Sequence, residues 1–86
     1  MTQEDLEAAA RHKPFEPFRL ILTTGDAYDI RHPELIMIGR RAAIIGIAKD
    51  PNKTTFDRTI KVDLFHVVGI EELPVSPPST NGPAAQ

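Results

Sequence analysis

The feature that most constrains the fold is a stretch of three apolar runs between Phe18 and Gly46, separated by short polar turns. In the first run, Phe18, Leu20 and Leu22 occupy every second position, and a period of two is typical of a half-buried β-strand. Thr24-Gly25-Asp26 follows, and alternation resumes from Ala27 to Arg31. Glycine accepts positive φ and aspartate can bond to its own backbone, so this tripeptide predicts the turn of a β-hairpin.

The middle of this stretch is divided by a proline. Proline donates no backbone N–H and pushes the preceding residue towards extended geometry, so we expect His32-Pro33-Glu34 to form a bend or bulge, or to lie on an edge. Leu35 to Ile38 resumes as a strand, and its apolar residues on both faces predict cover on both sides. Gly39-Arg40-Arg41 predicts a tight turn. In the third run, Ala42 to Ala48, Gly46 indicates a bulge or a close backbone approach.

The residues before this stretch predict a short helix from Thr2 to His12. Thr2 is a suitable N-cap, the acidic residues after it suit the positive end of the helix dipole, and Pro14 ends the helix. A helix of about eleven residues is unstable alone, so it must pack against other elements. The residues expected to make this contact are Leu6, Ala9 and Ala10.

The residues after this stretch predict two further strands. Residues 49–57 are a polar loop in which Phe56 is the candidate for folding back over the core. Thr59 to Leu64 alternates cleanly, and Val67 to Leu73 forms the last strand after an interruption at Phe65-His66.

The order of elements predicts a mainly β fold: a short N-terminal helix and a five-stranded bent antiparallel sheet or small barrel of the Sm-like or SH3-like kind. We expect one domain over residues 1–74 and a disordered tail over residues 75–86, which is proline-rich and carries no charge. The residues expected to point inward are Phe18, Leu20, Leu22, Ile30, Ile36, Ile38, Ile44, Val62, Leu64 and Ile70.

Composition limits the classes of function. The 86 residues include no cysteine, which rules out disulfides and thiolate chemistry and fits a cytoplasmic location. No apolar run approaches the roughly 20 residues of a membrane span, so no membrane association is expected. The net charge of −2 lacks the overall basic field of many nucleic-acid binders, although a local basic patch is compatible with it. A chain this short has a small core, so we expect a homo-oligomer, as a dimer or a ring.

Two resemblances extend this interpretation. The stretch KPFEPFRLILTTGDAYDIRHPELIMIGRRAAIIG, with VDLFHVVGIEEL near the end, resembles a widespread family of small uncharacterised bacterial proteins. Their shared pattern is roughly PFRPFxIxLxDGRxxxVxHPE, and it implies relatives without implying an activity. The match covers residues 13–73.

The second resemblance is to Sm-like proteins, including the bacterial RNA chaperone Hfq. It implies an N-terminal helix, a five-stranded bent barrel and RNA as a partner. Gly25 matches a glycine in the first hairpin turn, and His66 matches the histidine of a Tyr-Lys-His motif between the last two strands. Phe65 stands in place of the motif's lysine, a departure that removes a positive charge.

The candidate contact residues are few, and none predicts catalysis. His66 is either a ligand contact at a strand junction or a ring that satisfies backbone groups in a tight turn. Arg40 and Arg41, the one adjacent basic pair, are either a solvated turn or part of a phosphate-binding patch. The further members of that patch would be Arg31, Arg58 and Lys61, with Tyr28 as a base-stacking platform.

No nucleophile constellation or metal-ligand spacing occurs in the sequence, so we expect no enzymatic activity, cofactor or metal. Two hypotheses of function follow. The first is a non-enzymatic binding or assembly module that self-associates through sheet edges, and the alternative is an Sm-like RNA-binding regulatory protein.

Overall fold

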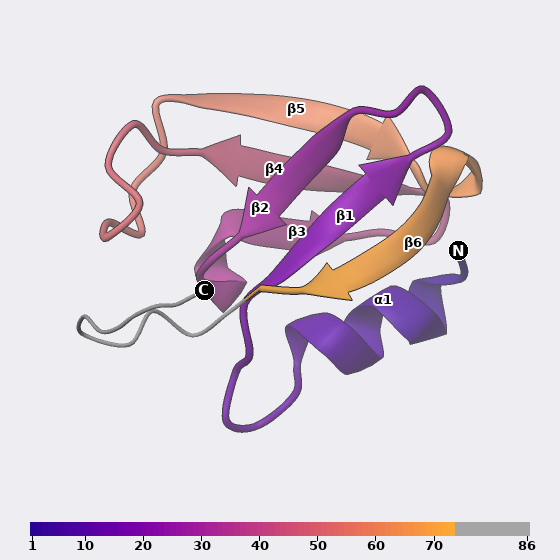
Figure 1. Ribbon diagram of the computed structural model, residues 1–86, viewed down its shortest axis with the longest axis horizontal. Helices are drawn as coiled ribbons and strands as arrows, with labels where there is room; N and C mark the ends of the chain where they lie inside the picture. The colour runs from indigo at the N-terminus through magenta and orange to yellow at the C-terminus, as the bar shows by residue number, and fades with distance from the viewer. Residues whose placement is uncertain (74–86) are drawn as a thin grey trace, which may run out of the picture.

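The computed structural model describes residues 1–73, and the expectation of a disordered tail lies outside these residues. Within these described residues, one helix, six strands and two short 3₁₀ turns follow one another (Figure 1). The helix is α1 (Gln3–Ala10), and the 3₁₀ turns are η1 (Pro33–Leu35) and η2 (Leu64–His66). The strands are β1 (Phe18–Leu22), β2 (Ala27–Ile30), β3 (Ile36–Ile38), β4 (Ala42–Ile47), β5 (Arg58–Asp63) and β6 (Val67–Glu72).

The strands form two three-stranded antiparallel sheets that pack face to face (Figure 1). Their orders are β2-β1-β6 in the first sheet and β3-β4-β5 in the second. The mainly β class with one short N-terminal helix is therefore confirmed. The expected single five-stranded sheet or barrel is not found. Within residues 1–73 the strands divide between two sheets that do not close into a barrel.

The two 3₁₀ turns explain this division. Pro33 opens η1, where the N–H of Leu35 donates to the carbonyl of His32 at 3.0 Å. The turn carries the chain from the first sheet to the second, so His32-Pro33-Glu34 is a connection between sheets rather than a bulge within one strand. In η2, Asp63 accepts a hydrogen bond from the N–H of Phe65 at 2.9 Å, and the chain returns to the first sheet. The expected interruption before the last strand is confirmed.

The hairpin of β1 and β2 is also confirmed. The N–H of Leu22 donates to the carbonyl of Asp26 and the N–H of Gly25 to the carbonyl of Leu22, both at 2.9 Å. Gly25 has a φ of 92°, which is the left-handed region that glycine enters without a Cβ clash. Such a three-residue loop sets the register in which Arg19 lies opposite Asp29.

The core lies between the sheets, and most of the expected inward residues line it. Leu22, Ile38 and Ile70 are only half-buried but pack against the core. Ile44 was expected inward, and this is wrong, because its side chain is 40% exposed and its neighbours Ala43 and Ile45 are buried instead. The expected residues that are fully buried are Phe18, Leu20, Ile30, Ile36, Val62 and Leu64.

The outer face of the second sheet is open at β3 and β4. Met37 is 67% exposed and pairs with Ile44 across the two strands. The expected cover on both faces of Leu35 to Ile38 is therefore wrong for Met37. Further along β4, Phe56 folds back from the loop onto this outer face and covers Gly46, which is buried.

Helix α1 seals one side of the sandwich. Thr2 caps it, since its hydroxyl oxygen accepts from the N–H of Asp5 at 3.1 Å, and Leu6 and Ala10 are fully buried. The helix ends at Ala10 rather than at the expected His12. It contacts β3 and lies along β6, where the N-terminal ammonium group donates to the carbonyl of Val67 at 3.2 Å (Figure 1). The edges of β3 and β6 therefore lie on the side that the helix covers.

Candidate functional site

The candidate contact residues occupy three separate places. Arg31 and Tyr28 line a groove between the sheets, Arg40 and Arg41 line a depression beside η2, and Lys61 lies on β5 opposite Ile44. Arg58 stands at the other end of β5 from the Arg40-Arg41 turn, since it pairs with Ile47 while Asp63 pairs with Ala42. A single basic patch of all these side chains is not formed.

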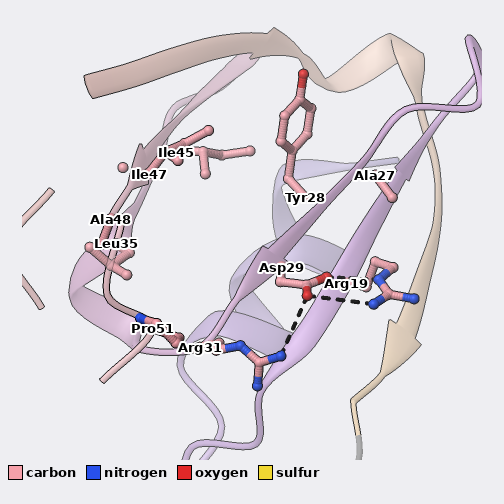
Figure 2. A pocket seen from close by; sticks show the side chains of 11 residues that line it. Arg19, Ala27, Tyr28, Asp29, Arg31, Leu35, Ile45, Ile47, Ala48 and Pro51 are labelled. Atoms are coloured by element: carbon pink, nitrogen blue, oxygen red, sulfur yellow. Dashed lines mark hydrogen bonds and ion pairs between the residues drawn. The ribbon is translucent and has the colours of Figure 1, made fainter. Parts of the chain in front are cut away.

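The groove between the sheets has a volume of about 440 Å³. One wall is β2, which contributes Tyr28 from its inner face, and the other is the end of β4, which contributes Ile45 and Ile47 (Figure 2). Leu35 of η1 and Pro51 of the loop after β4 also line the groove. The groove is therefore mainly apolar, as ligand sites commonly are.

The loop that bears Pro51 is held beside the groove by His32. The ring nitrogen Nε2 of His32 lies 3.1 Å from the carbonyl oxygen of Pro51. A carbonyl can only accept, so Nε2 carries the proton and donates. His32, expected to be a bend residue, thus also fixes the position of one groove wall.

Charged side chains lie on the outer side of the groove wall, and Figure 2 shows those of Arg19, Asp29 and Arg31. Arg19 of β1 donates from Nε to Oδ1 of Asp29 at 2.7 Å and from Nη1 to Oε1 of Glu71 at 3.3 Å. Arg31 reaches Oδ2 of the same Asp29 at 3.6 Å. The hydrogen bond and charge of Asp29, with a smaller effect of Glu71, raise the pKa of Arg19 above its ordinary value.

The depression beside η2 brings a basic pair next to an exposed aromatic ring. Arg40, Arg41, Asp63 and Phe65 line it, and its volume is about 420 Å³. The N–H of Leu64 donates to the carbonyl of Arg41 at 2.8 Å, which ties the basic turn to η2. Phe65 is 84% exposed, so its ring is available for contact.

His66 lies next to this depression but is held by its neighbours. Its ring makes an edge-on contact with Phe65, with centroids 5.7 Å apart, and Nδ1 lies 3.4 Å from the hydroxyl of Thr23. The N–H of Thr23 also donates to the carbonyl of His66 at 2.8 Å. His66 therefore ties the hairpin turn to η2, and its ring remains on the surface.

Among the groove residues that were missed as contact residues are Arg19, Asp29, Ile45 and Ile47. The signal for the first two was present, because a loop of residues 23–25 places Arg19 opposite Asp29. The two isoleucines belong to a run that is apolar on both faces, so its alternation could not tell which residues point inward.

In residues 1–73, no group of three or more histidine, aspartate or glutamate side chains is arranged to hold a metal ion. No helix in that part combines the length and hydropathy needed to cross a bilayer.

In comparisons with known proteins, no protein family, curated protein or solved structure matches this chain.

Proposed function

We propose that this chain is a non-enzymatic binding and assembly module whose copies associate through the surface where the last two strands meet. The observation that carries the proposal is the exposure of two apolar side chains there. Phe65 of η2 is 84% exposed and Val68 of β6 is 60% exposed. Apolar groups that face water on a small domain often mark an interface, because association removes their surface from water.

The backbone of β5 supports the same proposal. β5 pairs only with β4 among the described strands, so its other side is a sheet edge. The N–H of Leu64 donates to the carbonyl of Arg41, so these two residues form a hydrogen-bonded pair, and bonded and non-bonded pairs alternate along the ladder of β4 and β5. The N–H and C=O groups of Thr59, Lys61 and Asp63 therefore point away from β4. Outward backbone groups of this kind pair readily with another strand.

The two last strands are not equivalent in this proposal. Helix α1 lies along the outer side of β6, where Val67 already accepts a bond from the N-terminal ammonium group. We therefore assign strand pairing to β5 and side-chain contact to Phe65 and Val68. A domain of this size gains from the added burial, because its own core is small.

Sedimentation velocity at micromolar concentration tests the proposal. The wild-type chain is expected to sediment as a dimer or larger ring, and Phe65→Lys or Val68→Lys should shift it to a monomer. Met37→Lys is the matched control, since Met37 is similarly exposed but lies on β3, the edge strand opposite β5 in the second sheet. A monomeric wild type, or equal dissociation by the control, contradicts the proposal.

The second candidate function is binding of single-stranded RNA, in line with the resemblance to Sm-like barrels. One observation favours it: Arg40 and Arg41 line the same depression as the exposed ring of Phe65. Two guanidinium groups can contact phosphates while an aromatic ring stacks on a base. Asp63 in the same depression works against phosphate binding.

Binding of a fluorescent uridine decamer at several salt concentrations tests this candidate. The double variant Arg40→Ala, Arg41→Ala should weaken binding and flatten the plot of log affinity against log salt by about 0.7 per lost phosphate contact. The matched control is Arg58→Ala, at the far end of β5. Equal losses in the control and the double variant, or binding independent of salt, exclude this site.

A further inference from the structure

The groove lies beside a sheet edge that the described part of the chain leaves without a neighbouring strand. In residues 1–73, β2 pairs with β1 alone. The edges of β3 and β6 lie on the side that α1 covers, whereas β2 belongs to the other side of the sandwich. An open edge next to an apolar groove is the combination that takes up an extended peptide as an added strand.

The backbone groups that face outward from β2 follow from the hairpin. The bond from the N–H of Leu22 to the carbonyl of Asp26 defines one bonded pair, and bonded and non-bonded pairs alternate along an antiparallel ladder. Tyr28 therefore bonds towards β1, while Ala27 and Asp29 direct their N–H and C=O groups away from it. A strand laid along β2 would find both donors and acceptors there.

The side chains beneath this edge determine what the added strand must carry. Tyr28 points to the inner side of β2, towards the wall formed by Ile45 and Ile47 (Figure 2). Side chains directly opposite in paired strands point to the same face. A peptide residue opposite Tyr28 would therefore enter the groove, and the lining favours an apolar side chain.

The charge at one end of the groove adds a second requirement. Arg19 contacts two carboxylates, Asp29 and Glu71, at 2.7 and 3.3 Å. Arg31 contacts only the shared Asp29, at 3.6 Å, among the described residues. Two guanidinium groups thus share Asp29, and Arg31 is the one whose positive charge is less well balanced. Guanidinium groups bind carboxylates through paired hydrogen bonds, so a carboxylate suits this end.

We propose that this groove binds an extended peptide of a partner protein, which adds to β2 as a strand. Its apolar side chain packs over Ile45 and Ile47, and its acidic side chain pairs with Arg31. The wall from Ala27 to Arg31 spans roughly 13 Å at about 3.3 Å per residue, so a core of four to five peptide residues fills it. This site is separate from the assembly surface at Phe65 and Val68.

The test uses the full chain and a random heptapeptide library displayed on phage. Selection on the immobilised protein should recover sequences with apolar residues at alternate positions and an acidic residue at one end. Selection on Arg31→Glu should replace that acidic residue by lysine or arginine. Arg40→Glu makes the same charge change in the depression beside η2, away from the groove, and should leave the acidic preference intact.

Two further measurements separate strand addition from other modes of binding. N-methylation of the best recovered peptide at the amides that face β2 removes its backbone donors and should weaken binding at least tenfold. Ala27→Pro removes an outward N–H without removing a bond to β1, so it should weaken peptide binding while the melting temperature stays within a few degrees.

The outcomes that overturn the proposal are distinct. Failure to enrich any sequence, recovery of proline-rich peptides, or an unchanged acidic preference in Arg31→Glu each exclude this ligand class. An unaffected N-methylated peptide excludes strand addition. Loss of self-association in Ala27→Pro would show that a second copy of the chain occupies the groove instead.

Discussion

The ring of Phe56 lies directly over the backbone of Gly46. A Cβ atom placed on Gly46 would lie 2.9 Å from both Cγ and Cδ1 of Phe56 and 3.0 Å from its Cβ. These atoms lie near the base of the side chain, so a small rotation of the ring tip would not relieve the contact. The close approach expected at Gly46 is thus made by a side chain rather than by another backbone.

Gly46→Ala is therefore expected to destabilise the protein by about 1–3 kcal/mol, the usual cost of inserting a methyl group into a packed site. Urea denaturation measures this change. In a Phe56→Ala background the same substitution should be neutral or stabilising by up to about 1 kcal/mol, since alanine has less unfolded-state entropy to lose than glycine. Gly69→Ala is the control, because its Cβ would meet Ile21 at an ordinary 3.8 Å. Additive effects of the two substitutions would contradict the Phe56 contact.

Leu6→Ala should lower the free energy of unfolding by about 2–5 kcal/mol, the range for removing a leucine from a packed core. Leu6 is fully buried where α1 packs against the sheets. Thermal unfolding followed by circular dichroism measures the loss, and Ala8→Gln on the exposed side of the same helix is the control. A loss no larger than that of the control would show that the helix does not stabilise the sandwich.

Gly25→Ala should destabilise the hairpin by about 1–2 kcal/mol, because the φ of 92° at this position is unfavourable for a residue with a Cβ. No atom lies within 4 Å of the position that a Cβ would take, so the cost comes from the backbone and not from a clash. Gly25→Asn should lose less than Gly25→Ala, since asparagine tolerates the left-handed region better. Chemical denaturation of the two variants checks this order, and the reverse order would contradict it.

Local patterns predicted the elements well, because turn residues and alternation act over a few positions. Gly25 identified the first hairpin, and Phe65-His66 marked the break before β6. The sheet assignment failed at Pro33, because a proline shows that a strand is interrupted but not where the chain continues. Ile44 was placed on the wrong face because Ala42 to Ala48 is apolar on both faces. The sequence pattern therefore does not show which of its side chains point to the core.

The groove could be predicted only in part. Tyr28 and Arg31 were candidates for base stacking and phosphate binding, but their neighbours Ile47 and Pro51 come from a distant part of the chain. What brings them together is the η1 turn and the bond from His32 to the carbonyl of Pro51. Neither follows from periodicity, which describes one strand at a time.

The place of β1 in its sheet has a consequence for how the chain folds. β1 lies between β2, which follows it at once, and β6, whose Glu72 pairs with Phe18. The hairpin and the β3-β4-β5 meander can form from neighbouring residues, whereas the pairing of β1 with β6 must close a loop that contains all the other strands. During synthesis on the ribosome, the inner strand of the first sheet therefore waits with one side unpaired until the last strand has been made.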